Sequence, residues 1–275
     1  MSSRNQAGHE KLSGAWNFRD VTQTAGIAPG RLFRSSELSK LDDAGRAALT
    51  EIGVTDVADL RSPAELARRG PGAVPDDVVL HHLPFPEVSH SHSDSDEPAE
   101  APHETAWQKM MTEYSDEEPA EAGQRWMTGE YERFPTLGGA QRAVRKVITL
   151  LADGRAVLVH CFAGKDRTGF AVAIALEAAG VDKDAILTDY LRSNDATARL
   201  REHIVATTRS REGVTDEVVS FMESRLTDEV LGVREQYLST SRRVVEENYG
   251  GLDGYLRACE VSADDVARLR TALLG

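Results

Sequence analysis

The chain of 275 residues is 40% hydrophobic and 28% charged, with a formal net charge of −13. These values are typical of one globular domain, here residues 1–275, and the charge argues against binding nucleic acid or acidic membranes through the overall field. No apolar run approaches the roughly 20 residues that cross a bilayer, and residues 1–12 lack the apolar core of a signal peptide. We therefore expect a cytoplasmic protein without a transmembrane segment. Two cysteines, Cys161 and Cys259, exclude a disulfide framework.

The first part of the chain alternates predicted strands and helices behind an expected loose tail at residues 1–11. Turn-forming Gly and Pro residues separate these segments. Strands are predicted over residues 31–34, 54–60 and 78–83, and helices over residues 42–52 and 63–69.

An acidic stretch interrupts this pattern. Between Glu87 and Glu121 the chain has eleven Asp or Glu residues and one Lys. We expect residues 88–102 to form a mobile loop, because such a composition cannot bury enough apolar surface to fold. The stretch is either a solvated insertion, which we favour, or a gate over the active site. A metal site at the His and Asp side chains of residues 90–96 is disfavoured, since neighbours in such a tract seldom bind a metal together.

The second half is predicted to be mostly helical, with one strand at its centre. Helices are predicted over residues 103–111, 124–134, 137–152 and 168–179, and almost continuously from there to residue 274. Residues 156–160 (AVLVH) form a short apolar run typical of a central, buried parallel strand. The sequence therefore predicts an α/β fold in which helices flank a central, mostly parallel sheet. Such sheets bind ligands where strands end and helices begin.

The chemistry of the chain is concentrated in residues 160–169 (HCFAGKDRTG), directly after this strand. A thiolate at Cys161 is the predicted nucleophile for phosphoryl transfer. The start of the following helix can lower the thiol pKa from its usual value of about 8.5. Backbone N–H groups from Phe162 to Arg167 can form a nest for phosphate oxygens. Arg167 can add a bidentate guanidinium contact.

The remaining loop residues are expected to support this chemistry. Phosphate binding is predicted for Phe162, Ala163, Gly164, Lys165, Thr168 and Gly169. The glycines permit tight turns, Thr168 can donate its hydroxyl to the sulfur, and Lys165 places a second cation at the rim. His160 is expected to orient the loop through a backbone hydrogen bond rather than act as a base. Asp166 is either the general acid that protonates the leaving group, which we favour, or a structural residue that accepts loop N–H bonds or pairs with Arg.

Three other functions fit the loop less well. A nucleotide-binding P-loop requires Ser or Thr after Lys165, where this chain has Asp. A rhodanese-like enzyme also presents a cysteine at a strand-to-helix junction, but Arg167 followed by Thr-Gly fits a phosphate better. A catalytically dead phosphate-binding adaptor, the alternative function, would usually lack Cys161, Asp166 or Arg167. We predict a cysteine-dependent phosphatase that forms a phosphocysteine intermediate, with no metal and no cofactor.

The sequence resembles the atypical bacterial tyrosine phosphatases of the mycobacterial secreted phosphatase B type. The resemblance runs from about residue 14 to the C-terminus. Besides the loop, it rests on residues 16–20 (WNFRD), 31–41 (RLFRSSELSKL), 56–62 (DVADLRS) and 189–194 (DYLRSN). It implies one cysteine-phosphatase domain whose helical lid, here about residues 215–248, covers a deep pocket. The alternative for that range is helical scaffold.

The resemblance also implies roles and substrates. Cys161 would be the nucleophile, Arg167 the phosphate binder, Asp166 the acid and Lys165 a cation that favours phosphoinositides. The substrates would be phosphotyrosine, some phosphoserine and phosphothreonine, and phosphoinositides, and the protein would act in virulence after release into a host cell by a non-classical route. Glu87 departs from the expected Asp after Leu-Pro-Phe-Pro, which leaves its supporting role open. The chain has no Trp-Pro-Asp loop, which supports an acid inside the catalytic loop.

Overall fold

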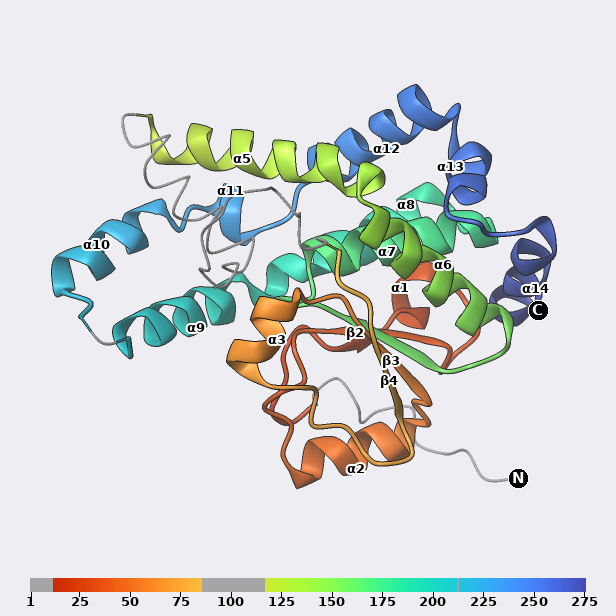
Figure 1. Cartoon of the computed structure of the whole chain (residues 1–275), viewed down its shortest axis with the longest axis horizontal. Helices are drawn as coiled ribbons and strands as arrows, with labels where there is room; N and C mark the ends of the chain where they lie inside the picture. Colours follow the sequence, from red (N-terminus) through yellow and green to blue (C-terminus); the bar gives the residue numbers. More distant parts are fainter. Residues whose placement is uncertain (1–11, 86–116, 212) are drawn as a thin grey trace, which may run out of the picture.

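The computed structural model describes residues 12–85, 117–211 and 213–275 (Figure 1). The expected tail at residues 1–11, the acidic loop at 88–102, the helix at 103–111 and Glu87 lie outside these residues.

A five-stranded sheet lies at the centre of the described chain (Figure 1). The strands follow the order β1 (Arg19–Asp20), β2 (Leu32–Ser35), β5 (Val157–His160), β3 (Asp56–Asp59) and β4 (Val79–His82). The last four strands in this order are parallel, and β1 is an antiparallel edge strand. The prediction of a mostly parallel sheet with the AVLVH strand at its centre is confirmed. We did not predict β1, because two residues show no periodicity.

The register of the three central strands brings their carboxyl ends together. Ser35 of β2 and Asp59 of β3 both lie beside His160 of β5. The loops that follow these strands therefore begin at the same edge of the sheet, where α/β proteins place their ligand sites.

Side chains alternate along the strands between two hydrophobic cores. One face contributes Leu32, Ala58, Val157 and Val159 to the larger core, which includes side chains of α6 (Gly138–Ala152) and α7 (Asp166–Ala179). The other face contributes Phe33, Val57 and Leu158 to a smaller core with α2 (Asp43–Ile52). Because helices cover both faces, the central strand β5 is buried along its whole length and carries apolar side chains at its first three positions, as the sequence pattern predicted.

The remaining helices lie around the sheet or extend to one side of it (Figure 1). They are α1 (Thr22–Ala25), α3 (Pro63–Arg69), α5 (Pro119–Arg133), η1 (Phe134–Thr136), α8 (Lys183–Leu191), η2 (Arg192–Ala196), α9 (Thr197–Arg209), α10 (Asp216–Arg225), α11 (Asp228–Leu231), α12 (Glu235–Tyr249), α13 (Leu252–Ala258) and α14 (Ala263–Leu274). Across the described residues, the search for a helix with the length and apolar character of a membrane span finds none.

The range 215–248, expected to be the lid, is divided between two environments. Helices α10 and α11 contact α9 and α5 and form one end of the molecule (Figure 1). Helix α12 instead packs on α5 and α13, and its Tyr237, Leu238 and Val245 belong to the larger core. The amino-terminal part of the range and α9, which precedes it, thus stand apart from the core, whereas α12 matches the scaffold alternative.

Candidate active site

The loop that carries Cys161 leaves the central strand at the shared carboxyl edge of the sheet. Cys161 follows β5 directly and is 3% exposed. Helix α7 begins at Asp166, two residues before the predicted start, so Asp166 and Arg167 lie in its first turn. Gly164 has a φ of +69°, and a Cβ there would lie 2.1 Å from the carbonyl oxygen of Ser35. Only glycine permits this turn.

Donors outside the loop hold the loop carbonyls. The backbone N–H of Glu37 donates to Phe162 O at 3.0 Å. Three further contacts are made by Asn17 Nδ2 to Ala163 O (3.0 Å) and to Gly164 O (3.1 Å), and by Arg34 Nη2 to Gly164 O (2.8 Å). Because each peptide group has its N–H opposite its C=O, carbonyls fixed outward turn the N–H groups inward. The loop is thereby shaped as an anion-binding nest.

A buried ion cluster fixes these donors in turn. Asp189 of α8 accepts from Arg34 Nη1 at 2.7 Å and from Arg19 Nε at 2.8 Å, and all three side chains are at most 5% exposed. Burial acts to raise the pKa of Asp189, but the two guanidinium groups outweigh it and hold the pKa below its ordinary value. Burial, together with Arg34, lowers the pKa of Arg19 to about 10. These residues come from the segments that carry the family resemblance, so those segments support the loop from behind.

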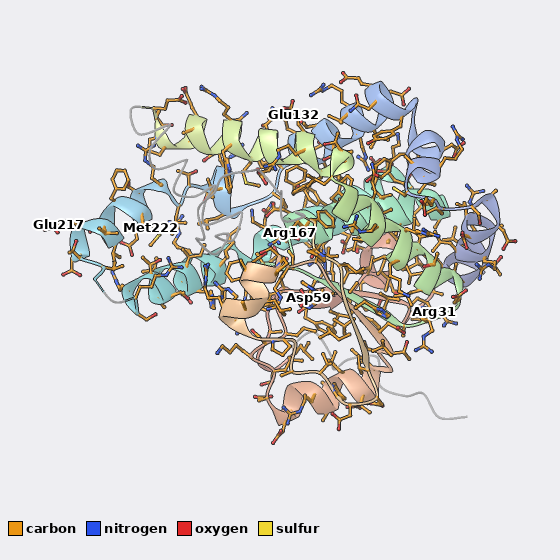
Figure 2. All side chains as sticks on the ribbon, viewed as in Figure 1. Arg31, Asp59, Glu132, Arg167, Glu217 and Met222 are labelled. Carbon is orange, nitrogen blue, oxygen red and sulfur yellow. The ribbon has the colours of Figure 1, made fainter. Side chains whose placement is uncertain are left out.

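Arg167 is held by a carboxylate that the sequence did not single out. Its Nη1 and Nη2 donate to Glu65 at 2.6 and 2.8 Å, and Nη1 also faces Leu60 O at 3.3 Å. Burial acts to lower the pKa of Arg167, but the Glu65 charge outweighs it and raises the pKa. Among the described residues nothing accepts from Arg167 Nε or from the second Nη2 hydrogen. Those two donors share one edge of the guanidinium, which suits two phosphate oxygens. Arg167 lies in the middle of the molecule, whereas Glu217 of α10 lies at its edge (Figure 2).

Glu65 reaches this position because it also caps α3. Its carboxylate accepts from the backbone N–H of Ser62 at 2.7 Å, and the Ser62 hydroxyl accepts from the Glu65 N–H at 3.1 Å. This reciprocal pair is a capping box, and the spacing Ser-x-x-Glu before a helix is its sequence signature. That signature could have identified Glu65 as a buried, fixed carboxylate. Its pairing with Arg167, which lies 102 positions further along the chain, could not be foreseen.

His160 makes the expected backbone contact. Its Nδ1 lies 3.2 Å from Cys161 O, and the N–H must be on that nitrogen because a carbonyl only accepts. Burial lowers the pKa of His160 despite Asp59, whose carboxylate lies 3.7 Å from Nε2. A neutral, fully buried imidazole in this position orients the loop.

Thr168 does not make the expected hydrogen bond to the sulfur. Its side chain is fully buried, and its Oγ1 has no partner among the described residues. An unpaired buried hydroxyl costs about 1–3 kcal/mol, so this group is available to an acceptor that enters the loop. At Gly169, a Cβ would lie 2.9 Å from the Tyr190 ring, which explains the glycine.

Asp166 faces the cavity and accepts from two donors. Tyr131 Oη donates to its Oδ1 at 3.0 Å, and Tyr190 Oη donates to Tyr131 Oη at 2.7 Å. Burial and the Asp166 carboxylate raise the pKa of Tyr131 well above its ordinary value, so its hydroxyl keeps its proton and donates it. The carboxylate also receives Lys165 Nζ at 3.2 Å. Asp166 is therefore fixed by Tyr131 and Lys165 rather than by Arg167.

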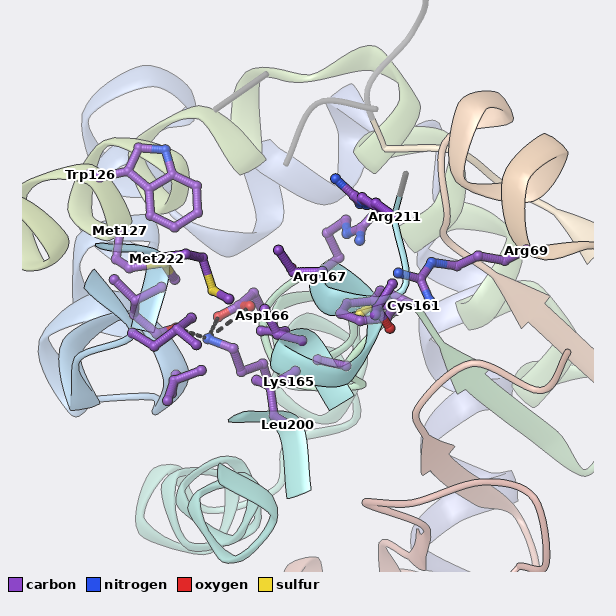
Figure 3. A pocket seen from close by; sticks show the side chains of 18 of the residues that line it. Arg69, Trp126, Met127, Cys161, Lys165, Asp166, Arg167, Leu200, Arg211 and Met222 are labelled. Atoms are coloured by element: carbon purple, nitrogen blue, oxygen red, sulfur yellow. Dashed lines mark hydrogen bonds and ion pairs between the residues drawn. The ribbon is translucent and has the colours of Figure 1, made fainter. Parts of the chain in front are cut away.

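Lys165 is buried, not at the rim where we expected it. It is 6% exposed, and its ammonium donates to Val230 O at 2.7 Å and to Gly232 O at 3.1 Å, besides Asp166 (Figure 3). An ammonium has three N–H groups, so these acceptors use all of them. The expectation of a second cation at the rim was wrong, because the carbonyls at the end of α11 come within reach of the loop.

A cavity of about 430 Å³ opens over the loop (Figure 3). Its floor includes Cys161, Asp166 and Arg167. Its walls come from α5, α9, α10 and α11 and are mainly apolar, with Trp126, Met127, Leu200, Ile204, Met222 and Leu226. Within the described residues, no three His, Cys, Asp or Glu side chains gather as metal ligands do.

Comparison with known proteins gives a consistent result. The model of the "tyrosine phosphatase family" matches residues 10–275. The triple specificity protein phosphatase PtpB of Mycobacterium tuberculosis is 54% identical over 276 residues, which cover 96% of this chain and 99% of that protein. A candidate tyrosine-protein phosphatase of Cupriavidus necator is 31% identical, over 92% of this chain and 84% of its own length. A tyrosine-protein phosphatase of Nostoc commune is 28% identical, over 87% and 73% respectively.

Proposed function

The chain belongs to the tyrosine phosphatase family, and from this we propose that it hydrolyses phosphotyrosine, phosphoserine or phosphothreonine, and phosphoinositides through a phosphocysteine at Cys161. The observation that carries the proposal is the loop of residues 161–167. Its carbonyls are fixed outward by Glu37, Asn17 and Arg34, and the nucleophile lies at its start. This arrangement binds a phosphate dianion by oriented donors in a chain of negative net charge.

In the first step, the Cys161 thiolate attacks the phosphorus atom. The S–P bond forms while the P–O bond to the leaving group breaks, and the carboxylic acid of Asp166 gives its proton to the departing oxygen. Arg167 and the inward N–H groups bind the three non-bridging oxygens, over which the charge of the transferred phosphoryl group is spread in the transition state. The Thr168 hydroxyl, which has no partner among the described residues, is available to the substrate oxygens or the sulfur.

In the second step, water attacks the phosphocysteine. Asp166, now a carboxylate, takes a proton from the water, the P–S bond breaks, and inorganic phosphate and the Cys161 thiolate result. Tyr131 and Lys165 hold the Asp166 side chain in one orientation in both steps. A fixed acid is required because both proton transfers use the same oxygen atoms on the same side of the phosphorus.

The cavity walls support a broad substrate range. The relative PtpB is named a triple specificity phosphatase, and the match covers 96% of this chain and 99% of that protein. Apolar side chains of α9, α10 and α5, such as Leu200, Met222 and Trp126, can pack on a phenol ring but impose no polar requirement on it. Helices α9 to α11 are the lid in this proposal, in place of the range 215–248.

Substitution of the nucleophile tests the proposal. Cys161→Ser is expected to abolish turnover of a phosphotyrosine peptide while binding of that peptide is retained. Cys259→Ser is the matched control, because burial raises the pKa of Cys259 to about 12 and that thiol is unreactive. Rapid-quench labelling of wild type with a 32P-phosphopeptide should trap label on Cys161. Turnover by Cys161→Ser would refute the mechanism, and peptide binding by a wild type without turnover would favour the adaptor.

The place of action follows from the family resemblance alone. We propose that the protein reaches phosphoproteins outside the producing cell by a non-classical route. Immunodetection in culture filtrate, with a cytoplasmic marker protein absent from the filtrate, tests export. Detection only in the cell pellet would overturn this part of the proposal.

A further inference from the structure

Arg69 is a second arginine that faces the active-site cavity. It lies at the end of α3 and its side chain, 13% exposed, extends toward the loop that carries Cys161 (Figure 3). Its guanidinium carbon lies 4.1 Å from the centre of the Phe162 ring, and Phe162 directly follows the nucleophile. The cation is therefore stacked beside the nest that binds the scissile phosphate.

Two contacts fix the orientation of this guanidinium. Arg69 Nη1 donates to Glu37 Oε1 at 2.9 Å and lies 3.3 Å from His203 Nε2 of α9. Burial and Arg69 itself lower the pKa of His203, so the neutral ring accepts the bond. These contacts use both hydrogens of Nη1. Nε and Nη2 together carry three of the five N–H donors, and none of these three has an acceptor among the described residues.

Lys165 offers the opposite case. Its three N–H donors are all used by Val230 O, Gly232 O and Asp166, so it has none for a substrate. Of the two cations, only Arg69 combines a fixed position in the cavity lining with donors that no described residue uses. Release of Lys165 would break its contacts with α11 and with the acid.

We propose that Arg69, rather than Lys165, binds the second phosphate of a polyphosphorylated inositol headgroup. This inference rests on the proposed function. The Arg69 guanidinium lies over the ring of Phe162, the residue that follows the nucleophile. An anion bound by this guanidinium must therefore lie very close to the scissile phosphate. Adjacent phosphates on a compact ring meet this condition. In a phosphopeptide, the phenol ring keeps neighbouring acidic side chains a ring length further out.

The test compares two substrates that differ by one phosphate. Water-soluble short-chain phosphatidylinositols with one and with two phosphates are assayed for kcat/KM by phosphate release. Arg69→Met keeps an apolar stem over Phe162 and removes the donors. We expect about a 10- to 100-fold lower kcat/KM on the bisphosphate and less than about a threefold change on the monophosphate and a phosphotyrosine peptide. Arg68→Met is the matched control, since Arg68 lies on the same helix, is exposed and does not line the cavity.

The outcomes distinguish a failure of this inference from a failure of the proposed function. Equal losses on every substrate would make Arg69 a positioning residue for the loop or for α9, and a selective loss on an acidic phosphopeptide would assign it to peptides. Either result overturns the proposal, as does a wild type without preference for the bisphosphate. Lys165→Met should slow all substrates alike, and a selective loss there would restore the role expected of Lys165. Retained phosphotyrosine turnover in wild type would leave the phosphatase assignment intact in each case.

Discussion

Glu65 is the residue whose substitution best tests how Arg167 is held. Its carboxylate accepts from both terminal nitrogens of Arg167 and from the backbone N–H of Ser62. Glu65→Gln keeps the side-chain length and one oxygen that can cap α3, but removes the charge. The guanidinium then faces a carboxamide, and its own charge has lost its buried partner.

The expected magnitude follows from the burial of the pair. Loss of a charge-assisted hydrogen bond costs about 1.5–3 kcal/mol, and removal of one partner from a fully buried pair costs about 3–5 kcal/mol. The Arg167 side chain is 15% exposed and Glu65 is 1% exposed, so water can partly replace the carboxylate at one end only. We therefore expect Glu65→Gln to lower the free energy of unfolding by about 2–3 kcal/mol. The same loss in the transition state lowers kcat/KM about 100-fold.

The assay must separate the loss of the pair from the loss of the helix cap. Ser62→Ala removes the other half of the capping box and should cost about 1 kcal/mol, with little change in kcat/KM. Urea unfolding measures stability, turnover of an aryl phosphate gives kcat/KM, and inhibition by vanadate reports oxyanion binding by Arg167. The reasoning would be refuted if Glu65→Gln matched Ser62→Ala in kcat/KM and in vanadate affinity.

Two further substitutions test the groups around the loop. Tyr131→Phe removes the hydroxyl that fixes Asp166, so we expect about a tenfold lower kcat for alkyl phosphates, whose leaving groups need the proton, and little change for aryl phosphates. A uniform loss would indicate damaged packing instead. Asp189→Asn should cost about 3 kcal/mol at pH 7, because it leaves the buried Arg19 and Arg34 without a carboxylate. Since these pairs hold the pKa of Asp189 below about 3.9, the wild-type advantage is present above that pH and is lost as pH falls through the folded-state pKa. Urea unfolding of both proteins at pH 7 and pH 3 measures this, and an undiminished difference at pH 3 would contradict it.

Local sequence patterns predicted the secondary structure around the site well. The helix at 63–69 has the predicted bounds, because Ser62 caps it, Pro63 begins it and Gly70 ends it. The central strand was predictable from its apolar run, since only a strand covered on both faces lacks polar positions. The loop was predictable because the spacing of Cys161 and Arg167 is a local property of the chain.

Contacts between distant segments account for what the sequence did not predict. The sequence predicted a second cation at the rim for Lys165, and only the approach of α11, 65 positions later, shows that its donors are used. The expected lid range, residues 215–248, joins α10 and α12, which the structure places in different environments. Which of them covers the cavity depends on what each apolar face meets. Nothing in the sequence indicated that Tyr131 contacts the active site, because its partner Asp166 lies on another helix.

The arrangement of charge explains how a chain with a net charge of −13 can bind phosphate. Each arginine behind the loop is matched by a buried carboxylate, as Arg34 is by Asp189 and Arg167 by Glu65. Pairing cancels most of the long-range field of these cations, but it fixes the direction of every remaining N–H group. An oriented donor is effective only where an oxyanion enters the loop, since its field falls off quickly with distance. Binding of phosphate by this loop therefore depends on the geometry of its donors and does not require a positive surface around it.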